Sequence, residues 1–317
     1  MFFSSVQAVA SIFVFLAIGF LITKVGWIDK NNKQLLSRLV LNIAVPCTIF
    51  TNMLSAVTPD TIGEMWGYLL APLSTVVIIY IVAYVLGKTI LRVQKNRQGT
   101  FAVMSSCANT VFVGLPIISL LFGEAGTPYV MYYLMAQTTL FWSVGSMGIQ
   151  RDGMGDSYTI SPLGTVKKIF NLNTIIIVVA LLTVALRISI PSMGMDILKK
   201  LGSMSTPLSL IFCGNSMYEV YANQGAKGLL VIPRDTFLVF LFRFIVCPVF
   251  TFFVCNLLNI TGLVRSVFVI VSALPTQANT VVLTNRYGAD DTFASITFFW
   301  TTLLSFAVIP ILLAIMG

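Results

Sequence analysis

The chain has 317 residues, of which 57% are hydrophobic and only 9% are charged, whereas soluble domains average about 25% charged residues. This composition excludes a soluble globular domain and predicts an integral membrane protein. The formal net charge is +8, but the basic residues lie in short clusters between apolar runs. They therefore indicate membrane topology rather than a nucleic-acid surface. Histidine is absent, which excludes imidazole catalysis and histidine metal ligands.

The five cysteines all lie inside apolar runs and show no CxxC spacing. This pattern favours small buried side chains over disulfides or a metal site. We therefore expect no cofactor.

Apolar runs of roughly 20 residues, the length that crosses about 30 Å of hydrocarbon, follow one another along the chain. We predict an all-α membrane protein with ten spanning helices, over residues 5–23, 36–54, 66–91, 100–122, 128–149, 169–188, 201–221, 236–258, 264–286 and 292–316. The only sustained polar stretch, residues 151–168, predicts a cytoplasmic linker between two five-helix units, residues 1–150 and 169–317.

The positions of the basic residues predict the orientation of these helices. Cytoplasmic loops carry an excess of Lys and Arg, and most of the 19 basic residues fall on one side if the N-terminus is outside. We therefore expect both termini outside the cell membrane. Arg187, Lys199 and Lys200 fall on the other side, and nothing beyond tolerance in an amphipathic loop accounts for them.

Two of the predicted helices are interrupted near the middle by proline and polar side chains, at residues 105–116 and 273–281. A broken helix frees backbone groups that each cost several kcal/mol in hydrocarbon, so breaks are tolerated only against protein or a wet cavity. We predict that residues 109–116 and 275–279 unwind, that the two helices cross there, and that a solute binds at the crossing.

The candidate binding residues lie in these interruptions: Asn109, Thr110, Gly114, Pro116, Pro275, Gln277, Asn279 and Thr280. A restarting half-helix presents free N–H groups and the positive end of its dipole, so it can hold a carboxylate without a full positive charge. Pro116 suits the first turn of such a half-helix. The two asparagines can donate to a carboxylate, coordinate a cation through their carbonyl oxygens, or only satisfy freed backbone groups.

The two halves of the chain also resemble each other locally. Residues 123–141 align with residues 288–306 at a constant offset, and the mid-helix prolines Pro46 and Pro207 align with each other. An odd number of helices per unit makes the second copy of a duplicated unit inverted in the bilayer. The two interrupted helices are then equivalent.

The motif Asn-Thr-Val-Phe-Val-Gly-Leu-Pro at residues 109–116, followed by Leu-Phe-Gly at 121–123, and the second-half motif Pro275-x-x-x-Asn279, followed by Tyr-Gly at 287–288, resemble the auxin efflux carrier family. The resemblance covers essentially the whole chain. Its members are similar to plant auxin exporters and to bacterial permeases for malonate, malate and related carboxylates. Their fold is similar to that of bile-acid symporters and sodium/proton antiporters.

The resemblance implies a transport domain of the third to fifth and eighth to tenth helices. This domain would move against a scaffold of the first, second, sixth and seventh, with substrate where the broken helices cross. Asn109 and Asn279 match the asparagines of that crossing. A homodimer through the scaffold is also implied. The long central loop of many plant exporters is reduced here to residues 151–168, so regulation through that loop does not carry over.

Charged residues inside the apolar runs are few. Arg243 is the one basic residue well inside a run, where a charge predicts a functional role. Because it follows Arg234 closely, the favoured interpretation is that it extends to the cytoplasmic interface. No acidic residue lies mid-run, so we do not expect coupling through a buried carboxylate.

We therefore expect a secondary transporter of a small organic anion, such as malonate, malate or an auxin-like acid, that works by alternating access of the elevator type. The alternatives are a sodium- or proton-coupled antiporter or symporter on the same fold, and then a channel. An enzyme is disfavoured because no nucleophile with a base and no metal cluster is indicated. The expected partners are the organic anion, membrane lipid and a second copy of the chain, with no nucleic acid.

Overall fold

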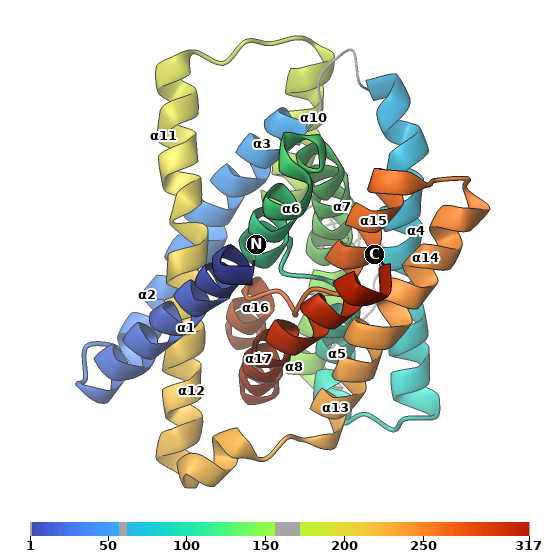
Figure 1. Cartoon of the computed structure of the whole chain (residues 1–317). Helices are drawn as coiled ribbons and strands as arrows, with labels where there is room; N and C mark the ends of the chain where they lie inside the picture. Colours follow the sequence, from blue (N-terminus) through green and yellow to red (C-terminus); the bar gives the residue numbers. More distant parts are fainter. Residues whose placement is uncertain (1, 57–61, 156–171, 317) are drawn as a thin grey trace.

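The computed structural model describes residues 2–56, 62–155 and 172–316, and all regular elements in these ranges are helical (Figure 1). The first half contains α1 (Phe2–Lys24), α2 (Lys30–Leu39), η1 (Val40–Ala44), α3 (Val45–Ala56), α4 (Ile62–Thr89), η2 (Lys95–Arg97), α5 (Gln98–Ser106), η3 (Thr110–Gly114), α6 (Leu115–Phe122), η4 (Gly123–Ala125), α7 (Thr127–Leu140), η5 (Phe141–Gly145) and α8 (Ser146–Met154).

The second half contains α10 (Leu172–Ala185), α11 (Ser192–Ser203), α12 (Ser205–Leu230), α13 (Arg234–Leu241), η7 (Phe242–Val246), α14 (Cys247–Leu257), α15 (Gly262–Ser272), α16 (Asn279–Tyr287) and α17 (Asp291–Met316). Most of the predicted linker lies outside the described residues. Its first residues are helical rather than a loop, because α8 continues to Met154 and ends at Gly155, which has a φ of 54°. A glycine tolerates that left-handed backbone conformation without strain.

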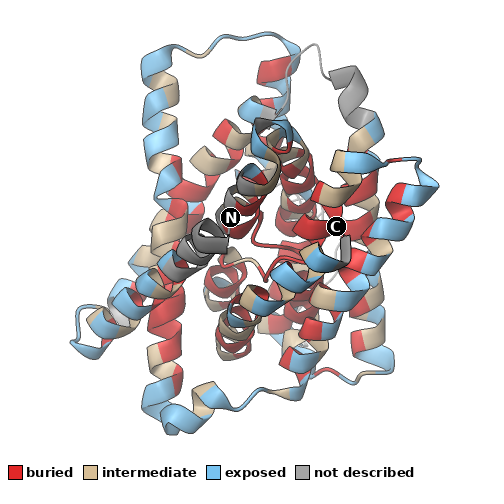
Figure 2. Cartoon of the chain, viewed as in Figure 1, coloured by how far each residue is buried: buried red, intermediate tan, exposed pale blue. Residues whose placement is uncertain are grey.

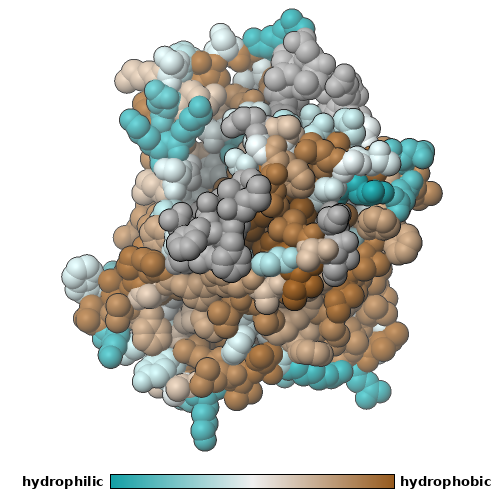
Figure 3. Space-filling view, in the orientation of Figure 1, coloured by the Kyte–Doolittle hydropathy of each residue, from teal (hydrophilic) through white to brown (hydrophobic). Residues whose placement is uncertain are grey.

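Four helical stretches in the described part of the chain are long and apolar enough to cross a membrane: Asn32–Ser55, Gly67–Thr89, Arg234–Leu257 and Asp291–Ala314. The other predicted spans fall on helices that are too short or not apolar enough by these criteria, so length and composition identify four of the ten predicted spans. Large apolar side chains such as Leu70, Phe253 and Leu257 are exposed, as expected for a surface in contact with lipid. In Figure 3 hydrophobic residues form a broad band, with hydrophilic side chains concentrated toward the top and bottom of the view.

The helices pack into two groups (Figure 1). In the first packing group, α1 lies along α12, α2 also contacts α12, and α3 contacts α10 and α11. In the second packing group, α4 contacts α5 and α7, α14 contacts α4 and α15, and α17 contacts α13, α15 and α16. Contacts of α12 with α16 and α17, of α3 with α7, and of α1 with α6 join the groups. Buried residues concentrate where the groups meet, around the ends of α5 and α16 (Figure 2).

Glycines allow α1 and α12 to approach closely. A Cβ atom added to Gly19 would overlap the backbone carbonyl of Ile211, and one added to Gly214 would overlap the carbonyl oxygen of Leu16. Small residues at such contacts let helix backbones approach and gain van der Waals packing, which drives helix association in lipid.

Three of the four π-turns in the described helices each end two residues before a proline: η1 before Pro46, η3 before Pro116 and η7 before Pro248, whereas η5 has no proline after it. Proline lacks an N–H and its ring clashes with the preceding turn, so a local π adjustment keeps the helix continuous. Pro207 differs from its predicted counterpart Pro46. It is the third residue of α12 rather than a mid-helix residue, a position where the missing N–H costs little.

Both predicted helix breaks exist, but the first is shifted. The helix α5 ends at Ser106 and the chain becomes helical again at Thr110, so residues 107–109 are non-helical instead of residues 109–116. The π-turn η3 accommodates Pro116, which removes the need to unwind there, and Pro116 is therefore not in the first turn of the restarting half. The second break covers residues 273–278, and Asn279 is the first residue of α16.

Candidate functional site

The two non-helical segments lie side by side and pair through their backbones. Ala108 and Thr276 form an isolated antiparallel bridge, and the N–H of Asn109 donates to the carbonyl oxygen of Pro275 at 2.8 Å. The side chain of Thr276 pairs in turn with Thr301 of α17 at 3.0 Å. Each break therefore satisfies part of the hydrogen-bonding capacity that the other exposes.

A glutamine from a third helix completes this arrangement. Gln137 of α7 accepts from the N–H of Ala108 at 3.0 Å and donates to its carbonyl oxygen at 2.9 Å. Its side chain is only 2% exposed. Sequence analysis missed Gln137, although an isolated amide within an apolar run was a usable signal.

Arg243 is also part of this region, and the expectation that it reaches the membrane interface is wrong. Its side chain is fully buried. The guanidinium donates to the carbonyl oxygens of Ser272 at 2.8 Å and Leu274 at 2.9 Å, where α15 ends. It also donates to Ser105 at 3.4 Å, where α5 ends. The carbonyl groups that both breaks leave without helical partners bind this cation in place of water at the membrane interface.

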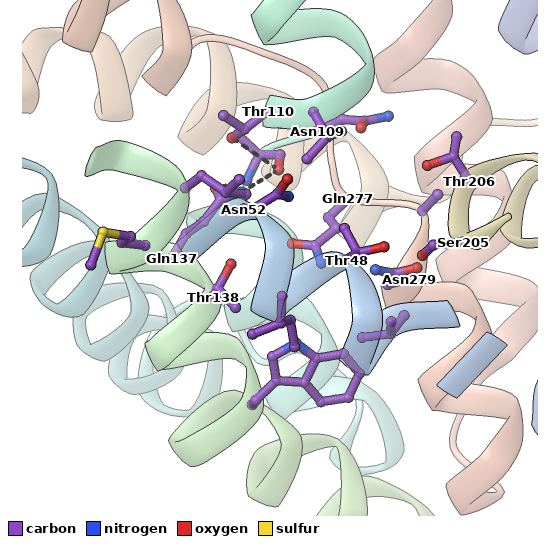
Figure 4. A pocket seen from close by; sticks show the side chains of 18 of the residues that line it. Thr48, Asn52, Asn109, Thr110, Gln137, Thr138, Ser205, Thr206, Gln277 and Asn279 are labelled. Carbon is purple, nitrogen blue, oxygen red and sulfur yellow. Dashed lines mark hydrogen bonds between the residues drawn. The ribbon is translucent and has the colours of Figure 1, made fainter. Parts of the chain in front are cut away.

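A cavity of about 70 Å³ opens beside the paired segments (Figure 4). It is bounded by α3, by α7, by the start of α12 and by both breaks. Its polar lining consists of Thr48, Asn52, Asn109, Thr110, Gln137, Thr138, Ser205, Thr206, Ser209, Gln277 and Asn279, and its apolar lining includes Met53, Met131, Leu134 and Trp142. No charged side chain among the described residues lines it.

Four of the eight predicted site residues line this cavity: Asn109, Thr110, Gln277 and Asn279. They come from both breaks, which the sequence places far apart. The helix α16 begins at Asn279 and the π-turn η3 begins at Thr110, so the positive ends of two helical segments face the cavity.

Three of the other predicted residues, Gly114, Pro275 and Thr280, are not among the described lining residues, and the side chain of Pro116 lies outside the described part of the chain. Pro275 contributes its carbonyl oxygen to the backbone pairing with Asn109. Gly114 lies against the side chain of Leu274, which a Cβ atom would approach to 2.8 Å. Thr280 is fully buried in α16, and Pro116 lies at the start of α6.

The amides of the cavity differ in how they are partnered. The Oδ1 of Asn279 accepts from the hydroxyl of Ser209 at 2.9 Å. The Nδ2 of Asn279 is the donor group of the same amide. Among the described residues, the buried Nδ2 of Asn109 and the buried Oε1 of Gln277 have no hydrogen-bond partner. An unpaired buried polar group costs about 1–3 kcal/mol, so a bound solute that pairs with these atoms recovers that energy.

Ion pairs lie at another part of the molecule, where α2, α12 and α17 meet. Lys33 of α2 pairs with Glu219 of α12 at 2.6 Å and with Asp291 of α17 at 3.2 Å. Arg97 pairs nearby with Asp290 at 2.8 Å. Lys33 therefore joins the first packing group to the second.

A family model described as a membrane transport protein matches residues 4–313. The chain belongs to this family, the auxin efflux carrier family. It is similar to an uncharacterized transporter of Methanocaldococcus jannaschii, with 26% identity over 306 residues that cover 96% of both chains. It is also similar to an uncharacterized transporter of Methanothermobacter thermautotrophicus, with 23% identity over 328 residues and 98% of each chain.

The family assignment agrees with the resemblance that the sequence motifs indicate. The family and the names of both relatives identify a multi-pass membrane transporter rather than an enzyme. The apolar helices support the same conclusion. In an auxin efflux carrier, a polar cavity between two helix breaks is the natural candidate for the substrate site.

Proposed function

We propose that this auxin efflux carrier family member is a secondary transporter of a small organic anion, and that the anion binds in the cavity beside the two helix breaks. The observation that carries the proposal is the cavity lining. It joins the starts of two helical segments to neutral amides and hydroxyls, without a carboxylate among the described lining residues. Such a lining attracts negative charge and offers donors to it.

Helix dipoles and amide donors are sufficient to hold one carboxylate. A helix N-terminus stabilises an anion by about 0.3–1 kcal/mol at exposed sites and up to about 2 kcal/mol in partly buried ones. The Nδ2 of Asn109 and that of Asn279 add donors, and a hydrogen bond to a charged group contributes about 1.5–3 kcal/mol. Two helix starts and two such hydrogen bonds together contribute about 4–10 kcal/mol before the costs of binding are subtracted, which favours a weak, readily released substrate.

The size of the cavity favours a small substrate. One water needs about 10–15 Å³ of such volume, so 70 Å³ suits a compact mono- or dicarboxylate such as malonate or malate. Trp142, Met131 and Leu134 cover the apolar wall and would contact the carbon skeleton. An auxin-like acid requires these side chains to move apart.

The proposed mechanism is alternating access of the elevator type in a fold of inverted five-helix repeats. The second packing group would be the transport domain, and the first the scaffold, as the family resemblance implies. The close glycine-mediated contact of α1 with α12 supports a rigid scaffold, and the backbone pairing of the two breaks supports their movement as one body. The proposal includes termini outside the cell membrane. It also includes a homodimer through the scaffold, and a mass measurement in lipid tests this oligomeric state.

The second candidate function is sodium- or proton-coupled transport on the same fold. The unpartnered Oε1 of Gln277 favours it, because a carbonyl oxygen is a ligand for a hard cation. The hydroxyls of Thr48 and Ser209 are further oxygen atoms in the same lining. No carboxylate stands among the described lining residues to balance the charge, so we rank this candidate second.

A ligand panel tests both candidates. Purified protein would be screened for thermal stabilisation by small mono- and dicarboxylates, by an aromatic acetic acid and by sodium alone. A ligand at about 100 times its Kd adds about 2.7 kcal/mol of stability. Counterflow of the best ligand in proteoliposomes would then distinguish a carrier from a channel. Stabilisation by sodium alone, with no response to any carboxylate, would overturn the anion proposal.

A further inference from the structure

The buried guanidinium of Arg243 occupies an unusual electrostatic position. It is the largest fully buried side chain in the described part of the protein. Its Nε and Nη2 donate to the carbonyl oxygen of Leu274 at 3.1 and 2.9 Å, and its Nη2 also reaches Ser272 at 2.8 Å. Its Nη1 reaches Ser105 at 3.4 Å. One side chain therefore binds the C-terminal ends of α5 and α15, the two half-helices that precede the breaks.

These partners are carbonyl dipoles and not carboxylates. None of the ion pairs among the described residues includes Arg243. The C-terminal ends of α5 and α15 carry about −0.5 charge each, which together offset the guanidinium, whereas the starts of η3 and α16 carry about +0.5 each. The region around the breaks therefore keeps about one net positive charge, and a buried charge without a counter-charge is costly.

The cavity is close enough to supply that charge through a bound anion. Leu274 precedes Gln277 by three residues, and three residues of extended chain span at most about 10 Å. Ser105, the other carbonyl partner of Arg243, likewise precedes Ala108 of the cavity lining by three residues. Screening is weak in a buried region, so the guanidinium acts on an anion in the cavity without touching it.

The same contacts leave little room for a metal cation. In transporters with discontinuous helices, unwound carbonyls and half-helix C-termini are the groups that coordinate sodium. Here the carbonyls of Ser105, Ser272 and Leu274 already accept from the guanidinium. A guanidinium is always protonated and covalently attached, so this positive charge neither dissociates nor depends on an ion gradient.

We propose that Arg243 is a resident cation that takes the place of a coupling sodium ion at the helix breaks. The inference rests on the proposed anion transport and deepens it. Arg243 is a positioning residue that fixes the ends of both half-helices, and its charge favours an anion in the neighbouring cavity. Anion binding is accordingly independent of sodium.

The first test needs no organic substrate. Thermal unfolding of the unmodified protein would be compared in sodium chloride and in choline chloride at equal ionic strength, and we expect no difference. Arg243→Ala should unfold at a lower temperature. Guanidinium chloride at a sub-denaturing concentration should restore part of the loss, whereas potassium chloride should not. Stabilisation of the unmodified protein by sodium would overturn the inference, whatever the substrate is.

The second test measures the Kd of the best carboxylate for variants at position 243. Arg243→Lys keeps the charge and should stay within about tenfold of the unmodified affinity, or about 1.4 kcal/mol. Arg243→Gln keeps donors without the charge and should bind more than tenfold more weakly. Arg265→Gln is the matched control, because Arg265 is not among the described lining residues of the cavity and contacts the side chains of Asn256 and Phe252 instead of carbonyls at the breaks.

The outcomes separate this inference from the proposed function. If no carboxylate binds the unmodified protein, the anion proposal fails, and the sodium comparison still decides the role of Arg243. If a carboxylate binds and Arg243→Gln binds it equally well, the resident-cation inference fails while anion transport stands. If Arg243→Ala does not fold, the lysine and glutamine variants and the sodium comparison still give a decision.

Discussion

The side-chain amide of Gln137 holds the backbone of Ala108 through two hydrogen bonds, one to its N–H and one to its carbonyl oxygen. The neighbouring N–H of Asn109 donates to Pro275, so Ala108 pairs with Thr276 while its own polar groups face α7. Gln137 therefore does for Ala108 what a third strand would do. The first break, residues 107–109, is therefore hydrogen-bonded to the second break on one side and to α7 on the other.

Removal of this amide should destabilise the protein. Gln137→Ala deletes two hydrogen bonds and leaves the buried N–H of Ala108 unpaired, which should cost about 1–3 kcal/mol. The carbonyl oxygen of Ala108 keeps a hydrogen bond from the N–H of Thr110 at 3.0 Å. Denaturant unfolding in detergent would measure the loss. Thr139→Ala on the same helix is the matched control, because Thr139 is exposed and, among the described residues, its hydroxyl bonds only to the carbonyl oxygen of Met135 in its own helix. Equal stability of both variants would show that water replaces Gln137.

The sequence was informative about the breaks because their cause is local. Proline and polar residues inside an apolar run disfavour a continuous helix wherever they occur, and both breaks lie within a few residues of their predicted positions. The first was shifted because Pro116 is accommodated by a π-turn, a backbone adjustment that proline content alone does not specify. The family could also be predicted from the sequence, because each of its motifs is a short stretch of neighbouring residues.

The roles of Gln137 and Arg243 could not be predicted, because both side chains act on breaks in other parts of the chain. Ala108 precedes its partner Gln137 by 29 residues, and Arg243 lies 138 residues from Ser105. From the sequence alone, the nearest partner for the charge of Arg243 is water at the membrane interface. Carbonyls freed by two distant breaks were the stronger partners, and they become visible only once the helices are packed.

The asparagines of the cavity distinguish an anion site from a cation site. Asn109→Ala and Asn279→Ala should each weaken carboxylate binding by about 1–3 kcal/mol, the cost of losing a hydrogen bond to a charged group. Asn109→Asp and Asn279→Asp should be worse, because a fixed negative charge repels the anion. Binding would be measured by isothermal calorimetry, with the exposed Asn256→Ala as control. An aspartate variant that binds the anion normally would exclude that amide as a ligand.

Asp152 provides a test of pH dependence outside the predicted membrane span. Its carboxyl accepts from the N–H groups of Gly99 and Thr100, at 2.9 and 2.6 Å, and from the hydroxyl of Thr100 at 2.8 Å. It thus caps the start of α5 from α8. Burial raises the pKa of Asp152 from 3.8 to about 6, although these hydrogen bonds lower it in part.

The sign of the effect follows from the raised pKa. Between pH 3.8 and about 6 the folded protein binds more protons at Asp152 than the unfolded chain does. Stability should therefore fall as pH rises through this window, by up to about 3 kcal/mol, and stay level above it. Asp152→Asn does not titrate and should lose this component. Thermal unfolding at closely spaced pH values would detect it, and superimposable profiles for both proteins would rule it out.

Lys33 links the two packing groups, because its ammonium contacts Glu219 in the first group and Asp291 in the second. If the second packing group is the transport domain, it must move relative to the first, so Lys33 and Asp291 separate during transport. Lys33 and Glu219 belong to the same scaffold and should stay together. A short thiol-reactive cross-linker tests this difference directly, because it can join either pair of positions after substitution by cysteine.

Lys33→Cys would be combined with Asp291→Cys in one protein and with Glu219→Cys in a matched control, both carrying Cys47→Ala. The other four native cysteines are buried and should react slowly. Cross-linking positions 33 and 291 should stop counterflow, and a cleavable linker should restore it on reduction. Cross-linking positions 33 and 219 should leave most of the rate. Full counterflow with positions 33 and 291 joined would mean that these elements stay together, and elevator motion between the two packing groups would be excluded.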